Sequence, residues 1–284
     1  MNSNLKNPFA PFASELSLAL DSTVQMALRE DLGAGDLTAQ LLPLGEVVKA
    51  HVIVRESAVL CGAPWFDAVM QALDDAIVVD WQYAEGDLMQ ADSVACRIEA
   101  PARSLLTAER SALNFLQLLS AVATVTRQYV NVIQGTNAVI LDTRKTLPGM
   151  RLAQKYAVRV GGGKNQRLAL YDGILIKENH IAAAGGIAPA LTAAHSVQKN
   201  SEHAITVQIE VENLQELNLA LDSGARSILL DNFDLTMMRE AVEINQGRAL
   251  LEASGGINFQ TVRAIAETGV DRISIGSLTK DIRA

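Results

Sequence analysis

The spacing of apolar residues divides the chain into regions with different predicted structure. Apolar residues recur at helical spacing between residues 16 and 28, and again from 104 to 134, which predicts two helices. Between residues 47 and 100 they form short runs separated by turns, as in AHVIVRESAVL and AIVVDWQY. This pattern predicts a compact α+β domain of short strands and small helices, in which no residue stands out as a candidate for chemistry.

Beyond residue 135, short apolar runs alternate with helical segments. The runs do not alternate with polar residues, which is typical of parallel strands covered on both faces. Several such units in series favour a β/α barrel over an open doubly wound sheet. The predicted strands are residues 138–142, 157–160, 173–177, 205–211, 227–231, 249–253 and 272–276, and the predicted helices are 187–198, 213–223, 234–245 and 258–268.

The strand ends of such a barrel supply candidate site residues, because active sites of β/α barrels lie at the C-terminal ends of the strands. Cations, carboxylates and glycine-bearing turns occur there: Arg144, Lys145, Lys177, Glu210, Asp231, Ser254, Gly255, Gly256 and Gly276. Glycine turns let backbone N–H groups approach an anion, and the loops of the last two strands bind phosphate in many barrels. The pattern therefore predicts a site for an anionic, phosphate-bearing ligand.

Several of these candidates have a simpler alternative. Glu210 and Asp231 offer oxygen ligands for Mg²⁺, or they pair with nearby cations. Lys177 has the residue type of a Schiff-base nucleophile, although the neighbouring cations fit better as ligands of a multiply charged anion. Arg110 follows Glu109 on the polar side of the second long helix, so a weak local ion pair is its alternative role.

The charge distribution singles out the stretch from Leu141 to His180. Eight lysines and arginines and three acids give it a net charge of +5, whereas the whole chain carries −8. A cationic segment in an acidic protein favours an anionic ligand held locally over a long polyanion, although a solvated helix face is the alternative. Within this stretch we expect Arg151, Lys155, Arg159 and Lys164 on the surface of a helix or loop.

Composition narrows the class of protein. The acidic balance and 4% aromatic content argue against nucleic-acid binding, and no apolar run approaches the about 18 residues of a membrane span. Two cysteines, Cys61 and Cys96, are too few for a metal cluster and favour a reducing, cytoplasmic location, where we expect them to be buried.

Seven motifs resemble the quinolinate phosphoribosyltransferase family, the carboxylating nicotinate-nucleotide pyrophosphorylases. They are ERSALNFLQLLSAVAT, DTRKTLPGMR, YAVRVGGGKNQR, LIKENHI, VQIEVENL, ILLDNF and EASGGI, and the resemblance covers the chain from about residue 15 to its end. It implies an N-terminal α/β sandwich domain (1–115, with segment 277–284 as a candidate addition) and an incomplete, open α/β barrel (116–276). The implied reaction transfers phosphoribosyl from phosphoribosyl pyrophosphate to quinolinate, giving nicotinate mononucleotide, pyrophosphate and CO₂ in de novo NAD biosynthesis.

The resemblance also implies roles for single residues. Substrate binding falls on Arg110, Arg144, Gln166, Arg167, Lys177, Ser254, Gly255, Gly256 and Gly276, and catalysis on Lys145, Glu210 and Asp231. Mg²⁺ falls on Glu210 and Asp231. Arg110 is implied to reach the site from the other subunit of a homodimer, or of a higher oligomer built from it.

Two positions depart from the family pattern. Gln166 stands where a histidine is usual, and Gln208 stands where an acid is common. Glutamine donates a hydrogen bond but never becomes cationic, so affinity and pH dependence can differ. A related transferase with another substrate, such as the molybdenum-transport-associated protein, or a catalytically inactive anion-binding homologue are the alternative functions.

Overall fold

The computed structural model describes residues 13–284, which divide into two compact units. Unit 1 contains the chain up to Arg127, together with 147–162 and 279–284, and unit 2 contains 128–146 and 163–278. One long helix, α3 (Ala102–Val132), contributes residues to both units. The predicted boundary between residues 115 and 116 falls inside this helix, and the division into domains stays a prediction.

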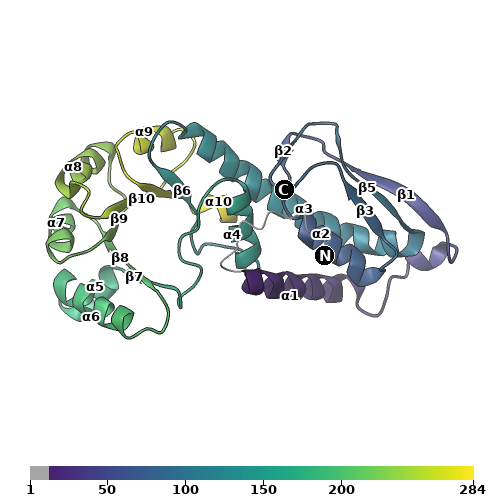
Figure 1. Cartoon of the computed structure of the whole chain (residues 1–284), viewed down its shortest axis with the longest axis horizontal. Helices are drawn as coiled ribbons and strands as arrows, with labels where there is room; N and C mark the ends of the chain where they lie inside the picture. Colours follow the sequence, from purple (N-terminus) through teal and green to yellow (C-terminus); the bar gives the residue numbers. More distant parts are fainter. Residues whose placement is uncertain (1–12) are drawn as a thin grey trace. The chain divides into compact units, whose positions relative to one another are not determined.

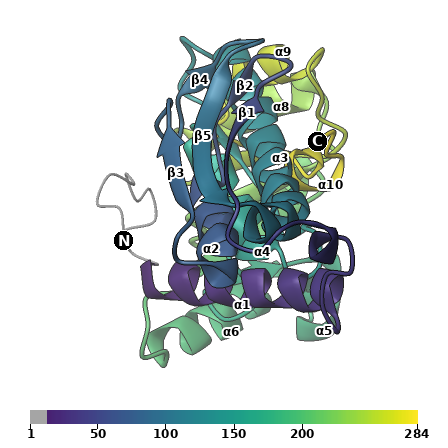
Figure 2. The same ribbon diagram turned by 90° about the vertical axis from the view of Figure 1, so that its right-hand side faces the viewer.

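Unit 1 contains an antiparallel sheet with the strand order β1-β5-β3 and a two-stranded pair, β2-β4. Along β5 the buried Cys96, Ile98 and Ala100 alternate with the exposed Arg97 and Glu99, so one face of the sheet packs on the core. Figures 1 and 2 show the strands of this sheet beside α2 and α3. The other elements of this unit are α1 (Ala13–Leu32), η2 (Ala39–Leu41), β1 (Val47–Ile53), β2 (Ala58–Val59), α2 (Ala63–Leu73), β3 (Val78–Trp81), β4 (Leu88–Met89), β5 (Val94–Pro101) and α4 (Arg151–Val160).

Unit 2 contains a six-stranded parallel sheet with the order β6-β11-β10-β9-β8-β7. Its strands lie in an arc with α6 to α9 on the outer side (Figure 1). Among the described residues β6 does not pair with β7, so the barrel is incomplete, as predicted. The elements are β6 (Val139–Leu141), β7 (Gly173–Ile176), α5 (Glu178–Ala184), α6 (Ile187–Lys199), β8 (Thr206–Val211), α7 (Leu214–Asp222), β9 (Ser227–Asp231), α8 (Leu235–Asn245), β10 (Leu250–Ser254), α9 (Val262–Ala266), β11 (Arg272–Ser274) and, running from unit 2 into unit 1, α10 (Ser277–Lys280).

The predicted strand at residues 157–160 is wrong, because these residues form the second half of α4. The apolar residues Ala153, Tyr156, Ala157 and Val160 are buried at helical spacing, and this longer period outweighs the preference of two valines for a strand. The expected surface position of Lys155 is also wrong, because its side chain on the same helix is 0% exposed.

The predictions about the cysteines and about membrane spans can be compared with the described residues. Both cysteines, Cys61 and Cys96, are buried and free of disulfides, as expected. No helix within residues 13–284 is both long enough and apolar enough to cross a membrane.

Candidate active site

The predicted site residues of unit 2 come from the C-terminal ends of its strands or from the loops that follow them. Parallel strands bring these ends to one edge of the sheet, which we call the rim. The rim holds Arg144, Lys145, Lys177, Glu210, Asp231, Ser254, Gly255, Gly256 and Gly276, and the loop before β7 adds Gln166 and Arg167.

Arg144 and Arg167 interact through their like charges. The Arg167 guanidinium donates to the carbonyl of Gly173 at 2.8 Å. Partial burial lowers the pKa of Arg167, and the positive charge of Arg144 lowers it further. Two guanidinium groups that repel one another in a partly desolvated place suit a ligand with two anionic groups, since each can bind a carboxylate through paired N–H groups.

The side chain of Lys145 lies against Gly276, which is in the loop that follows β11. Its backbone N–H donates to the hydroxyl of Thr143 at 3.0 Å. A Cβ at Gly276 would lie only 3.1 Å from Cδ of Lys145, so a larger residue there would push against this side chain. The ammonium group of Lys145 therefore lies beside a glycine turn, which is an arrangement that suits a phosphate oxygen.

Lys177 and Glu210 form an ion pair, with Nζ 2.8 Å from Oε2. The alternative role predicted for Glu210, pairing with a cation, is therefore present in the structure. His180 accepts a hydrogen bond from the backbone N–H of Lys177 through Nδ1 at 3.0 Å. This contact fixes the chain where β7 turns into α5 and gives the KENH motif a structural role.

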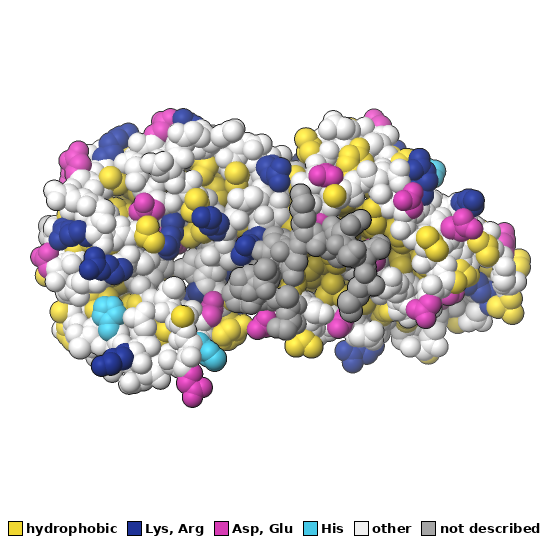
Figure 3. Space-filling model, viewed as in Figure 1, with side chains coloured by type: hydrophobic (Ala, Val, Ile, Leu, Met, Phe, Trp, Pro, Cys, Tyr) yellow, Lys and Arg dark blue, Asp and Glu magenta, His cyan; other side chains and the backbone are white. Residues whose placement is uncertain are grey.

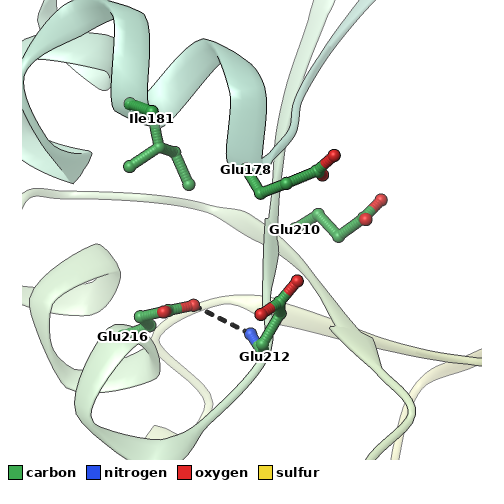
Figure 4. Close-up of a pocket in the computed structure, with 6 residues that line it drawn as sticks. Glu178, Ile181, Glu210, Glu212 and Glu216 are labelled. Carbon is green, nitrogen blue, oxygen red and sulfur yellow. Dashed lines mark hydrogen bonds between the residues drawn. The ribbon is translucent and has the colours of Figure 1, made fainter.

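Glu210 also lines an acidic pocket of about 180 Å³. Figure 4 shows Glu178 and Glu210 side by side, with Glu212 and Glu216 below them. Within residues 13–284 no group of three or more histidine, cysteine or acidic side chains has the arrangement of a metal site. The sequence did not single out Glu178, Glu212 or Glu216 as site residues, because acids on helix starts and loops are usually solvated.

The end of β9 is shaped by Asn232, which has a left-handed backbone with φ of 56°. Its side-chain amide donates to the carboxylate of Asp231 at 3.0 Å, and its backbone N–H donates to the carbonyl of Ser254 at 3.0 Å. A Cβ at Gly255 would lie 2.0 Å from Oδ1 of Asn232. Glycine at this position is therefore needed for the turn to lie against Asn232, whose side chain contacts Asp231.

A chain of side-chain hydrogen bonds runs below the rim. The amide of Gln166 donates to Oε1 of Gln208 at 2.7 Å, and the amide of Gln208 donates to Oε2 of Glu252 at 2.9 Å. The backbone N–H of Gln166 donates to Asp142 at 3.0 Å. The two positions that depart from the family pattern are thus in direct contact, which neither departure alone predicted.

Glu252 is the last residue of this series of hydrogen bonds and lies inside unit 2. Its side chain is 1% exposed, and burial raises the pKa of its carboxyl group. Among the described residues Oε1 of Glu252 has no hydrogen-bond partner. Sequence analysis missed Glu252 because its position inside a strand predicts a core residue, and the only signal was an acid in an apolar run.

Arg110 lies in unit 1, on the exposed side of α3. Within residues 13–284 no salt bridge joins it to Glu109 or another acid, so the alternative role as a local ion pair is absent. On the face shown in Figure 3, Lys and Arg side chains lie apart from one another among uncharged atoms.

An incomplete parallel α/β barrel with arginines, a lysine, carboxylates and glycine turns at its rim defines a class of enzyme that handles multiply charged anions. Two family models cover most of the chain: the N-terminal domain of quinolinate phosphoribosyl transferase matches residues 36–120, and the C-terminal domain matches residues 122–284. The chain belongs to the quinolinate phosphoribosyl transferase family.

Named relatives of this family match this chain over nearly its whole length. The nicotinate-nucleotide pyrophosphorylase [carboxylating] of Mycobacterium leprae is 41% identical over 93% of this chain and 94% of its own. The solved structure of the nicotinate-nucleotide pyrophosphorylase from Francisella tularensis is 45% identical, covers 94% of this chain and 93% of its own, and has a TM-score of 0.90. That from Ehrlichia chaffeensis is 38% identical over 93% and 95%, with a TM-score of 0.86. These names do not favour the alternative functions.

Proposed function

We propose that this chain transfers the phosphoribosyl group of phosphoribosyl pyrophosphate to quinolinate, with loss of CO₂, to give nicotinate mononucleotide in NAD biosynthesis. The observation that carries the proposal is the pair of interacting guanidinium groups of Arg144 and Arg167 at the rim of the barrel. Quinolinate carries two adjacent carboxylates, and such a ligand relieves the repulsion between two like charges. Family membership supports the same assignment.

Binding of quinolinate is assigned to Arg144 and Arg167, with Lys177 and the uncharged donor Gln166 beside them. Paired N–H groups of arginine suit flat carboxylates better than the single ammonium of lysine. Lys177 is held by Glu210, with Nζ 2.8 Å from Oε2, and this contact positions its ammonium at the rim. The ring nitrogen of the bound substrate attacks C1 of the ribose with its own lone pair, and no general base is required.

The second step to be stabilised is the departure of pyrophosphate from an oxocarbenium-like sugar. Lys145 lies beside Gly276, and the turn Ser254–Gly256 follows β10, so an ammonium and backbone N–H groups are assigned to the phosphates. Glu210 and Asp231 are carboxylates, which suit Mg²⁺, and substrate phosphates and water would complete the shell. When bound there, the ion would supply positive charge to the leaving pyrophosphate.

Loss of CO₂ leaves the electron pair of the broken carbon–carbon bond on a ring carbon, where it must be stabilised. Once the ribosyl group is attached, the adjacent ring nitrogen is cationic and stabilises this pair by its charge, and the pair then binds a proton on the same carbon. The substrate therefore carries its own stabilising charge, and a Schiff base on Lys177 is unnecessary.

The site is proposed to be completed by Arg110 from a second copy of the chain in a homodimer. The exposure of Arg110 and the absence of a salt bridge to it among residues 13–284 support this assignment. Mixing inactive Arg110→Ala and Arg144→Ala subunits should restore activity, because half of the dimers become hybrids with one intact site of two. Recovery should approach about a quarter of wild-type activity, and none after proven subunit exchange would contradict the shared site.

We further propose that the protein works in the cytoplasm. Its two cysteines are buried and free of disulfides, which suits a reducing compartment.

The proposed reaction is tested by incubating the protein with quinolinate, phosphoribosyl pyrophosphate and Mg²⁺. We expect equal amounts of CO₂ and nicotinate mononucleotide. A parallel reaction with nicotinate, which lacks the second carboxylate, serves as the control and should be much slower. Turnover of nicotinate at the same rate, or no turnover of quinolinate, would contradict the proposal.

A further inference from the structure

Gln166 differs chemically from a cationic donor in one respect that matters for a dicarboxylate ligand. A protonated imidazole presents N–H donors at both ring nitrogens, whereas an amide has a donor end and an acceptor end. If the amide of Gln166 turned the wrong way, its oxygen would face the carboxylate and repel it. A glutamine in this position therefore needs neighbours that fix its orientation.

The structure supplies such neighbours in a fixed order. Oε2 of Glu252 accepts from Gln208 whether the carboxyl group is ionised or carries its proton on Oε1. This contact turns the amino group of Gln208 toward Glu252 and leaves Oε1 of Gln208 facing Gln166. Nε2 of Gln166 donates to this Oε1 at 2.7 Å. Gln208 and Glu252 are 5% and 1% exposed, so water is a poor competitor for these bonds.

We call the hydrogen-bonded series Gln166, Gln208 and Glu252 the relay. The strands that carry Gln208 and Glu252 lie on either side of β9. Gln208 belongs to β8 and Glu252 to β10, so their side chains meet on one face of the sheet across the intervening strand. Gln166 is held separately through its backbone, which donates to Asp142 at 3.0 Å. The backbone contact fixes the position of Gln166, and the side-chain contact fixes the orientation of its amide group.

We infer that Gln208 and Glu252 are positioning residues for substrate binding: the amino group of Gln166 donates one hydrogen to Gln208, and this contact directs its second hydrogen toward a carboxylate of the ligand. The inference rests on the proposed function, in which Gln166 contacts quinolinate. It goes beyond that function because neither Gln208 nor Glu252 touches the substrate.

The test is a double-mutant cycle read out by calorimetric binding of quinolinate. Gln208→Met keeps the length of the side chain and removes its hydrogen bonds. It should weaken quinolinate binding about tenfold, in the range of one hydrogen bond to a charged group, and change the KM for phosphoribosyl pyrophosphate by no more than about twofold. In a Gln166→Ala background the same substitution should change affinity by less than about twofold, since no amide is left to orient.

Two further variants keep the test decisive if Gln208→Met folds poorly. Glu252→Gln retains an acceptor for Gln208 and should keep quinolinate affinity, whereas Glu252→Leu should weaken it like Gln208→Met. Asn245→Leu is the matched control, because Asn245 is a buried amide with two hydrogen bonds to the backbone of Ala249 before β10 begins, at the opposite end of the strands. It should lower stability and leave quinolinate affinity unchanged.

Each outcome separates the relay from the proposed function. A wild-type protein that converts quinolinate, combined with equal losses from Gln208→Met in both backgrounds, would overturn the relay alone. Unchanged affinity in Gln208→Met or equal losses in both Glu252 variants would do the same. A wild-type protein that neither binds nor converts quinolinate would overturn the function and the relay together.

Discussion

Both units contain partly buried charged side chains, but the two units surround these side chains differently. In unit 1 the carboxylate of Glu85 accepts from the backbone N–H groups of Gly62 at 2.7 Å and Ala63 at 3.2 Å, at the start of α2. At the rim of unit 2 the charge of Arg144 disfavours the charged form of Arg167. The carboxylate in unit 1 is hydrogen-bonded by the backbone of its own unit, whereas the two guanidinium groups in unit 2 repel each other.

This difference separates structural charge from functional charge. Burial raises the pKa of Glu85, and the N–H groups of Gly62 and Ala63 oppose that shift, so the group serves the packing of α2. Partial burial and the charge of Arg144 lower the pKa of Arg167, and the charge of Asp172 only partly offsets them, so an anion bound at the rim would stabilise the charged guanidinium further. Substitutions of the buried acids of unit 1 should therefore change stability, and substitutions at the rim should change binding and turnover.

The largest expected effect follows from removing one of the two arginines. Arg144→Ala should lower kcat/KM for quinolinate about 1,000-fold, because losing one partner of a desolvated charge pair costs about 2–5 kcal/mol. Calorimetry should show loss of quinolinate binding and largely retained binding of phosphoribosyl pyrophosphate. The exposed Arg239 on α8 supplies the control, and Arg239→Ala should leave both affinities unchanged. Unaltered quinolinate affinity in Arg144→Ala would contradict the assignment of Arg144 to quinolinate binding.

A smaller effect is expected in the glycine turn after β10. Gly255→Ala places a Cβ 2.0 Å from Oδ1 of Asn232 at a φ of 107°, whereas Gly256→Ala meets nothing within 4 Å at a φ of 58°. The first change should lower kcat/KM for phosphoribosyl pyrophosphate about 10- to 100-fold, since strain of about 1–3 kcal/mol displaces Asn232 from Asp231. The second change carries only the strain of its backbone and should do less. Equal losses in the two variants would show that the contact with Asn232 is unimportant.

The fold of unit 2 was largely predictable because its strands are short apolar runs between helices. The predicted strand at 227–231 has the same limits as β9, and that at 205–211 differs from β8 by one residue. Residues 157–160 were misassigned because valine favours strands locally, while the burial of Tyr156 and Val160 on one helix face depends on tertiary packing. Short helices such as α5 were missed because seven residues carry little periodic signal.

The site was predictable only in part. The rule that strand ends form the site selects Lys145, Glu210 and Asp231 from order along the chain alone. The contact between Gln208 and Glu252 depends on which side chains meet across β9, and strand order and curvature are not written in the local sequence. For the same reason the contact of Lys145 with Gly276, which are far apart in the chain, required the structure.

The smallest expected effect on activity comes from a buried carboxyl group of unit 1. Burial raises the pKa of Asp67 to about 6 from 3.8, although Trp81 donates to it at 3.0 Å. The unfolded chain therefore loses this proton first, and wild-type stability should fall as pH rises from about 4 to about 6 and then level off. Asp67→Asn keeps an acceptor for Trp81 and lacks this fall, so urea unfolding at pH 7.5 should find it more stable than wild type by up to roughly 3 kcal/mol, with the gain vanishing near pH 4. Its kcat/KM should equal that of wild type, and the exposed Asp75→Asn should show neither effect. A pH-independent difference in stability, or a changed kcat/KM, would mean that charge buried in unit 1 is not purely structural.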